Sequence, residues 1–311
     1  MSLPVYAFLG PEGTFTDAAL RAMTADVEIV ALPTVDVPAA LAAVRSGEAD
    51  FAVVAIENTV EGGVTATLDT LAEGAPLVIL AEYVIPVAFE LVTRDVTAMT
   101  SIARVAAHAH GLAQCRRWIS ANLPDVIQVA ATSNSAAAVA LADGTADFDA
   151  ALAPPGTAAR LGLHLVTDGV ADNAKAATRF VRVGRPGSLP PVTGADKTTL
   201  VVHLPEDRAG ALLEMLEQFA VRGVNLSRIE SRPIGDKPGE YAFSIDALAH
   251  IGEARLAEVL VGLKRTCPVV TFLGSYPAAH GARTPVAKGT SDVDYKTARE
   301  WVEGLRSASG S

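Results

Sequence analysis

The sequence predicts an α/β protein of two consecutive lobes, followed by a smaller ferredoxin-like domain. Up to about residue 184, short apolar runs alternate with Ala-rich helical patterns. After a Pro- and Gly-rich segment the order becomes strand, helix, strand, strand, helix, strand. A length of 311 residues allows roughly two domains of ordinary size.

Continuous apolar runs predict the strands of the first lobe, at residues 5–9, 27–32, 51–56 and 76–80. Runs that are apolar throughout, rather than at alternate positions, are typical of a parallel sheet covered on both faces. We expect helices after Thr16 and Asp36, with these two residues as N-caps, and we expect Gly47 to end the second helix.

The same alternation restarts after residue 84 and predicts a second lobe. Its strands are expected at residues 102–109, 125–131 and 164–168, with a further apolar segment at 148–153. A further strand at 176–183 is expected to return to the first lobe. The predicted catalytic domain therefore spans 1–184, with lobe 1 at about 1–84 plus 168–184 and lobe 2 at about 85–167.

A linker at 185–196 separates this part from a predicted small domain at 197–277. The order βαββαβ in that domain is that of a ferredoxin-like fold with an antiparallel sheet. Residues 278–311 are expected to form a polar tail, with a marginal helix near 294–305.

The composition excludes several classes of protein. Half of the residues are hydrophobic, but no uncharged run reaches the roughly 18–20 residues that span a bilayer. The N-terminus lacks the basic region and long apolar segment of a secretory signal. A net charge of −10 argues against a nucleic-acid surface. We therefore expect a cytoplasmic protein with neither a membrane nor a nucleic-acid partner.

Metal and cofactor signatures are missing from the sequence. There is no G-x-G, no phosphate-binding loop and no G-x-S-x-G. His108 and His110 form an isolated H-x-H pair, and Cys115 and Cys267 lie far apart. We expect neither a metal nor a cofactor.

The segment G-P-E-G-T-F-T at 10–16 ends a predicted strand and opens a helix. One interpretation is a turn followed by a helix cap. The other is that backbone amides and the hydroxyls of Thr14 and Thr16 face a ligand carboxylate at the helix N-terminus.

Two further segments place polar groups at strand ends. Glu57 and Asn58 directly follow the third strand, at the edge where open α/β sheets bind ligands. Glu57 could instead satisfy backbone donors of the Gly-rich turn, whereas Asn58 can both donate to and accept from a hydroxyl. Thr178 and Arg179 begin a later strand, where the guanidinium suits a planar carboxylate unless it is an ordinary surface arginine.

Taken in order, these motifs resemble those of the monofunctional prephenate dehydratase family. The family pattern G-P-x-G-T-[FY]-[ST] is matched at 10–16, and P-I-E-N-[ST]-x-x-G-x-V at 55–64 with Ala55 in place of proline. T-R-F is intact at 178–180. S-H-P-Q-x-L-x-Q-C is only partly kept at 107–115, with departures at Ala107, Ala109 and His110. The small domain resembles an ACT regulatory module, with G-A-L at 210–212 and E-S-R-P at 230–233.

The resemblance implies a fold like a type 2 periplasmic binding protein, with the active site between the lobes. The family reaction decarboxylates prephenate and expels its ring hydroxyl, giving phenylpyruvate without a cofactor. By this resemblance, Arg179 is expected to bind a carboxylate of the substrate. Thr178 is expected to hydrogen-bond the departing hydroxyl. The other residues that it brings to the site are Asn58, Glu57, Thr14, Thr16, Gln114, His108 and Phe180.

The same resemblance implies that the ACT module binds L-phenylalanine at a dimer interface and regulates the enzyme. The expected binding residues are Gly210, Ala211, Leu212, Asn225, Leu226, Glu230, Ser231, Arg232 and Pro233. A homodimer or homotetramer is therefore expected.

Two other functions stay open from the sequence. The substrate could be arogenate, which carries an amine where prephenate has a ketone. The chain could also be a non-enzymatic amino-acid sensor, in which Thr178 and Arg179 form only a carboxylate clamp.

Overall fold

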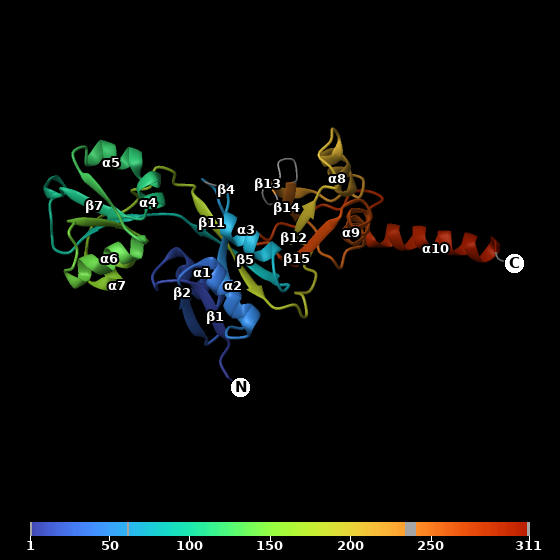
Figure 1. The fold of residues 1–311 in the computed structure, drawn as a ribbon, viewed down its shortest axis with the longest axis horizontal. Helices are drawn as coiled ribbons and strands as arrows, with labels where there is room; N and C mark the ends of the chain where they lie inside the picture. Colours follow the sequence, from blue (N-terminus) through green and yellow to red (C-terminus); the bar gives the residue numbers. More distant parts are fainter. Residues whose placement is uncertain (1, 61, 234–240, 310–311) are drawn as a thin grey trace. The chain divides into compact units, whose positions relative to one another are not determined.

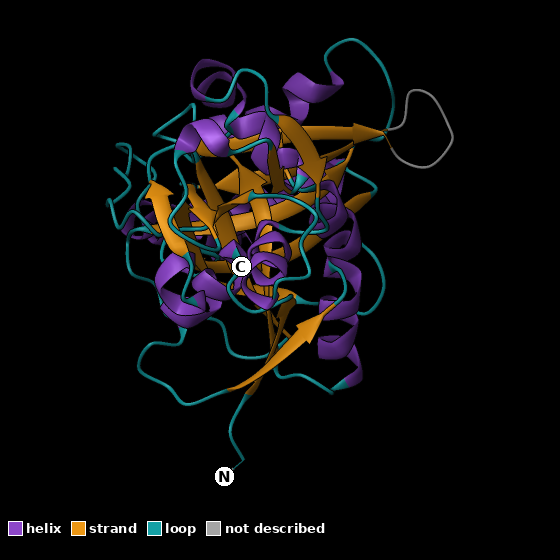
Figure 2. Cartoon of the chain, turned by 90° about the vertical axis from the view of Figure 1, so that its left-hand side faces the viewer, coloured by secondary structure: helices purple, strands orange, loops and turns teal. Residues whose placement is uncertain are grey.

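The computed structural model describes residues 2–60, 62–233 and 241–309. The chain divides into two compact units, unit 1 from 1–67 and 83–180, and unit 2 from 68–82 and 181–311. The described chain contains both helices and strands (Figure 2). Glu61 and the ends of two predicted strands, at 234, 235 and 240, lie outside the described residues.

The first sheet confirms the predicted strands of lobe 1. Its order is β2 (Val30–Thr34), β1 (Val5–Leu9), β3 (Phe51–Asn58), β11 (Ala177–Gly184) and β5 (Val78–Pro86), with the short β4 (Gly62–Gly63) paired to β3. Strand β1 is parallel to both of its neighbours, β2 and β3, as expected. α3 (Thr65–Ala72), β5 and β11 each belong in part to both units.

The strand predicted to return to lobe 1 does return. The backbone N–H of Thr59 donates to the carbonyl of Ala177 at 3.0 Å, and Ala177 N–H donates to Thr59 Oγ1 at 2.9 Å. The start of β11 therefore lies beside the end of β3.

Helix α1 (Phe15–Met23) begins earlier than expected, and the expectation that Thr16 caps it is wrong. The cap is Thr14, whose Oγ1 accepts from Asp17 N–H at 3.2 Å. Asp17 Oδ2 in turn accepts from Gly13 N–H at 2.8 Å. Together these two bonds tie the residue before the cap, the cap and the first turn, and so fix the helix start, with Thr16 buried in the first turn.

Helix α2 (Val37–Ser46) begins and ends as its sequence predicts. Asp36 caps it by accepting from Ala39 N–H at 2.7 Å. Gly47 ends it in the left-handed region, at a φ of 85°, where a residue with a Cβ would be strained.

The second sheet forms lobe 2. Its order is β10 (His164–Thr167), β6 (Glu90–Thr93), β9 (Ala150–Ala153), β7 (Arg104–Ala107) and β8 (Ile127–Ala130). Helices α4 (Ala109–Gln114) and α5 (Arg116–Asn122) cover one face, and α6 (Asn134–Asp143) and α7 (Thr157–Leu161) cover the other (Figure 1). Two apolar cores result, one around Val105 and Ile119 and one around Ala106 and Leu141.

Strand β6 is an addition to the predicted elements. Glu90, at its start, is buried because its carboxylate accepts from the N–H groups of Gly156 and Ala158, at 3.0 and 2.7 Å. A search for apolar runs does not find a strand that begins with a buried acidic residue. The burial of Glu90 is explained only by its hydrogen bonds to a distant part of the chain.

Unit 2 confirms the βαββαβ order. Its antiparallel sheet has the order β13 (Leu226–Pro233), β14 (Tyr241–Ala247), β12 (Asp196–His203) and β15 (Val269–Pro277). Helices α8 (Ala211–Ala220) and α9 (Ala254–Thr266) supply apolar side chains to one face of the sheet. The last helix, α10 (Asp292–Ser309), is longer than the predicted one and extends beyond α9 with most of its side chains exposed (Figure 1).

Within the described ranges, no helix is both long and apolar enough to cross a membrane.

Gly274 lies against the backbone of β5. Its φ is 128°, and a Cβ there would overlap the carbonyl oxygen of Ile79. We expect Gly274→Ala to lower the free energy of unfolding by about 1–3 kcal/mol, because it adds both backbone strain and a clash. Chemical denaturation measures this difference, with Gly281→Ala as a control, because nothing lies near that left-handed glycine. Equal losses of unfolding free energy in the two variants would show that the backbone conformation, and not the clash with Ile79, causes the effect.

Cys115 is buried in the lobe 2 core. Burial, and next the charge of Asp172, raise the pKa of its thiol to about 12. At pH 8 only about one thiol in ten thousand is then ionised, so Cys115 should resist thiol reagents until the protein unfolds. A colorimetric disulfide reagent should report little reaction in the native state and both cysteines in denaturant. Rapid native labelling that disappears in Cys115→Ala would contradict this expectation.

Candidate active site

Asn58 and Thr178 meet where the end of β3 lies beside the start of β11. Asn58 Nδ2 donates to Thr178 Oγ1 at 3.1 Å, although the two residues are 120 positions apart. Asn58 Oδ1 accepts from Val60 N–H at 2.8 Å, and this bond fixes which end of the amide faces Thr178. Since Thr178 Oγ1 accepts from Asn58, its own O–H is oriented to donate to a ligand.

Glu57 and Arg179 form a second pair between the same two strands. Arg179 Nε donates to Glu57 Oε2 at 2.9 Å. The guanidinium side chain is only 7% exposed and Glu57 is 35% exposed. Arg179 is therefore not an ordinary surface arginine, and Glu57 supplies the counter-charge that a buried guanidinium requires.

Phe180 lies in the hydrophobic core of lobe 1 rather than on an open surface. It is 2% exposed and belongs to the cluster that contains Tyr6, Phe8 and Leu20. Its contacts anchor the strand that presents Thr178 and Arg179.

Thr14, Thr16 and His108 line one cavity of about 350 Å³ within unit 1. The 10–16 segment is thus both a capped turn and a cavity wall. The Thr14 hydroxyl is already used, because Oγ1 caps α1 and also donates to Leu9 O at 3.4 Å. His108 Nδ1 accepts from His110 N–H at 3.3 Å at the start of α4.

The start of α6 contributes cavity residues that the sequence does not indicate. Ser135 Oγ donates to the carbonyl of Gly13 at 2.7 Å, and Asn134 Oδ1 accepts from His108 N–H at 2.8 Å. Both bonds tie α6 to motif segments far away in the chain. The sequence signal here is only local, namely a serine cap at Ser133 before an Ala-rich helix.

Gln114 lines a smaller cavity of about 180 Å³, whose walls include Val60 and Ala176. Val60 is two residues after Asn58, and Ala176 is two before Thr178, so this cavity adjoins the Asn58–Thr178 pair. Gln114 Oε1 is buried and has no hydrogen-bond partner among residues 2–60, 62–233 and 241–309, so it can accept from a ligand.

The loop before β11 is held by Asp172. Its N–H donates to Gln114 O at 2.8 Å. Its carboxylate accepts from the N–H groups of Arg117 and Trp118, each at 2.9 Å. These bonds fix the approach of the chain to Thr178.

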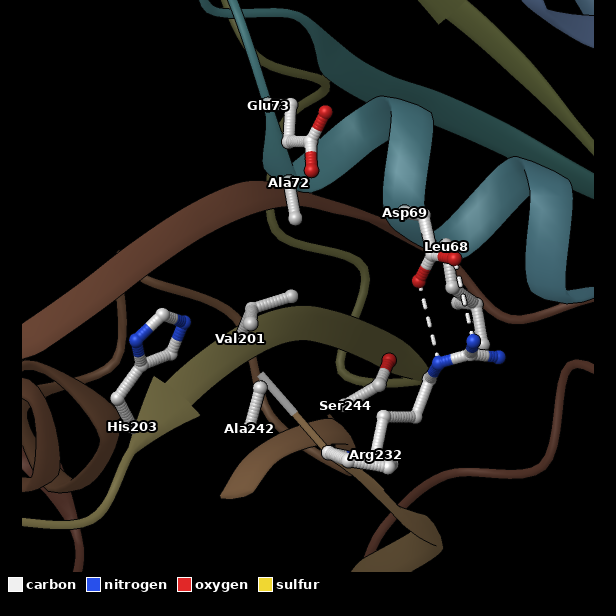
Figure 3. Close-up of a pocket in the computed structure, with 10 residues that line it drawn as sticks. Leu68, Asp69, Ala72, Glu73, Val201, His203, Arg232, Ala242 and Ser244 are labelled. Atoms are coloured by element: carbon white, nitrogen blue, oxygen red, sulfur yellow. Dashed lines mark hydrogen bonds and ion pairs between the residues drawn. The ribbon is translucent and has the colours of Figure 1, made fainter. Parts of the chain in front are cut away.

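The residues expected to bind phenylalanine lie in unit 2, some at the start of α8 and the others on β13 or directly before it. Gly210 starts α8 with a φ of 89°, and Ala211 behind it is buried. Arg232, on β13, lines a cavity of about 250 Å³ that none of residues 210–212 lines (Figure 3). Within one chain, G-A-L and Arg232 therefore do not share this cavity.

The described side chains offer hydroxyl, amide and guanidinium groups rather than a metal-binding set. No group of three or more His, Cys, Asp or Glu among residues 2–60, 62–233 and 241–309 is placed to hold a metal ion. The arrangement at β3 and β11 can bind an anion and donate a hydrogen bond to an oxygen beside it.

Comparison with known proteins assigns both parts of the chain. The family model "Prephenate dehydratase" matches residues 6–188, and the model "ACT domain" matches residues 198–264. A prephenate dehydratase of Amycolatopsis methanolica is 44% identical over 302 residues, which cover 96% of this chain and 97% of the relative.

Two solved structures are similar along most of their length. One is a prephenate dehydratase of Arthrobacter aurescens in complex with L-Phe, with a TM-score of 0.90 and 47% identity, covering 97% of this chain and 99% of that one. The other is GqqA, described as a novel type of quorum quenching acylase, with a TM-score of 0.77 and 28% identity over 88% of this chain and 98% of that one. The match of the family model to residues 6–188 and the 44% identity along nearly the whole chain show that this chain belongs to the prephenate dehydratase family.

Proposed function

We propose that Thr178 and Arg179 carry the decarboxylation and dehydration of prephenate to phenylpyruvate in this chain. The observation that carries the proposal is the hydrogen bond from Asn58 to Thr178, because it orients a hydroxyl donor beside a buried guanidinium. Glu57, Gln114 and the cavity residues Thr14, Thr16 and His108 complete the proposed site.

The reaction requires one anionic substrate to lose two groups. The bond between the ring and its carboxylate breaks and releases CO2, and that electron pair enters the ring. The bond to the ring hydroxyl then breaks, and the departing oxygen takes a proton to leave as water. The product ring is aromatic, which supplies the driving force without a cofactor.

In this proposal, Thr178 stabilises the departing oxygen. A threonine hydroxyl is a weak acid in water, so its contribution depends on orientation and on exclusion of solvent. Thr178 is 8% exposed, and the Nδ2 donor of Asn58 polarises its O–H toward the ligand. The proton that Thr178 lends is recovered from water after the product leaves.

Arg179 holds a substrate carboxylate, for which we propose the one on the pyruvyl side chain. Glu57 fixes the guanidinium through Nε at 2.9 Å, so the position of the positive charge is set before substrate arrives. Gln114 Oε1, which is buried and has no hydrogen-bond partner in the described part of the chain, is proposed to accept from the substrate.

The regulatory part of the proposal concerns residues 197–277, after a catalytic domain at 1–184 and a linker at 185–196. The similar Arthrobacter protein is described in complex with L-Phe, and this chain carries G-A-L and E-S-R-P in an ACT domain. We propose that L-phenylalanine binds there and inhibits turnover.

A cytoplasmic homo-oligomer is proposed along with this regulation. β13 is an edge strand of its sheet, and Ile229 on it is 44% exposed. Leu213 and Val221, at the two ends of α8, are also exposed. An apolar edge of this kind is stabilised when a second copy covers it.

The catalytic proposal predicts the effect of Thr178→Ala. Removal of one positioned donor should lower kcat for prephenate by about 100-fold or more, while KM changes little because Arg179 still binds the carboxylate. Phenylpyruvate absorbance in alkali measures turnover above the acid-catalysed background, with arogenate as a comparison substrate.

Thr178→Ser is the matched control, because it keeps the hydroxyl. It should retain kcat within about tenfold of the wild type, since only the methyl group is lost. A Thr178→Ala enzyme with kcat near that of the wild type would remove Thr178 from the proposed role.

The regulatory proposal predicts that millimolar L-phenylalanine both slows turnover and raises Tm. A ligand at 100 times its Kd stabilises the folded state by about 2.7 kcal/mol, a shift that thermal melting detects. D-phenylalanine is the matched control. If L-phenylalanine changes neither quantity, the regulatory site is not in this protein.

A further inference from the structure

Arg232 of the E-S-R-P segment forms an ion pair with Asp69 on α3, the helix that follows β3 and β4. Arg232 Nε lies 3.1 Å from Asp69 Oδ1, and Arg232 Nη2 donates to Asp69 Oδ2 at 3.1 Å (Figure 3). Both residues belong to unit 2. The Nη2 contact is a hydrogen bond, and the Nε contact is a close approach of opposite charges beside it.

Asp69 lies on α3, and the start of that helix is bonded to the strand that carries Glu57 and Asn58. Val64 N–H donates to Ile56 O at 2.9 Å, directly before Glu57. Thr67 Oγ1, half a turn before Asp69, donates to Ala55 O. A helix transmits a displacement along its axis, so the position of Asp69 is linked to the strand end at Glu57 and Asn58.

The backbone of Arg232 is fixed within the antiparallel sheet of unit 2. It pairs with Ala242 in the register of β13 and β14. On the same strand, Arg228 donates to Asp246 at 2.9 Å and to Ser244 at 2.8 Å within a buried polar network. A change in the position of β13 therefore moves the guanidinium of Arg232.

We infer that Asp69 and Arg232 are positioning residues for catalysis, and that their ion pair carries the effect of a regulatory ligand to Glu57 and Asn58 through α3. This inference rests on the proposed function. The Asp69 side chain is 49% exposed and that of Arg232 is 24% exposed, so the coupling is modest. Ion pairs of this exposure change equilibria by about two- to fivefold.

The experiment compares four variants of the full chain. Asp69→Asn and Arg232→Gln each remove one charge, and the double variant Asp69→Arg with Arg232→Asp reverses the pair. Glu73→Gln is the matched control, because Glu73 lies one turn further along the chain and lines the same cavity. For each variant, kcat, KM, the half-inhibitory concentration of L-phenylalanine and the rise in Tm with L-phenylalanine are measured.

We expect Asp69→Asn, which leaves the E-S-R-P segment intact, to raise the half-inhibitory concentration by two- to fivefold while L-phenylalanine still raises Tm. Arg232→Gln should raise it at least as much, with a smaller effect of L-phenylalanine on Tm, because Arg232 also belongs to the proposed binding segment. The reversed pair should recover most of the inhibition, and Glu73→Gln should match the wild type. A residue with only a structural role would lower Tm without changing the half-inhibitory concentration. If folded single variants are inhibited within 1.5-fold of the wild type, the inference is wrong.

The design separates this inference from the proposed function. If the wild type does not respond to L-phenylalanine, the regulatory proposal fails, and the positioning role is then judged on kcat/KM alone. A change of at least twofold in Asp69→Asn and Arg232→Gln, absent in Glu73→Gln, supports positioning. Values that match the control overturn it.

Discussion

The hydrogen bond between Asn58 and Thr178 depends on the return of the chain to its first sheet. Asn58 and Thr178 are 120 residues apart, and the whole of lobe 2 is built between them. The two crossing segments are themselves joined, since Val87 N–H donates to Ala176 O at 2.7 Å. Lobe 2 is thus attached to lobe 1 through two neighbouring strands, an arrangement that permits lobe closure while the bond between Asn58 and Thr178 is kept.

In the proposed site, the burial of charge at this junction would let an acidic protein bind an anion. The net charge of −10 repels a dianion at long range. At short range, Arg179 is nearly buried and is fixed by Glu57, so its interaction with a carboxylate is weakly screened. The remaining donors at the junction are neutral, namely the Thr178 hydroxyl and the Asn58 amide. Binding therefore depends on a local geometry and not on the overall field.

The sequence was sufficient to predict most elements, because apolar runs and local caps are local properties. Asp36 and Gly47 delimit α2 as their chemistry requires. At α1 both Thr14 and Thr16 are candidate caps, and the bond from Asp17 N–H to Thr14 Oγ1 identifies Thr14 as the cap. The T-x-x-D spacing there was an available signal.

The polar partners of the site were harder to predict, because each one depends on a tertiary contact. T-R-F and E-N are recognisable as motifs, but their pairing as Asn58 with Thr178 and Glu57 with Arg179 follows only from the contact of β3 and β11. The role of Ser135 depends on a bond to Gly13 across 122 residues. β6 was missed because its first residue is a buried glutamate that two backbone N–H groups satisfy.

The ion pair between Asp69 and Arg232 can transmit a regulatory effect because of its position in the fold. Its own contribution to stability is small, about 1 kcal/mol or less. Regulation requires only a difference in that contribution between two states, and coupling energies of about 1–3 kcal/mol suffice for most allosteric effects. The start of α3 is bonded to the segment that holds Asn58, so a small displacement at Asp69 acts on an orientation-dependent hydrogen bond. In the proposed reaction the contribution of Thr178 depends on that orientation, so a weak contact at the sheet of unit 2 would have a larger effect on turnover than on folding.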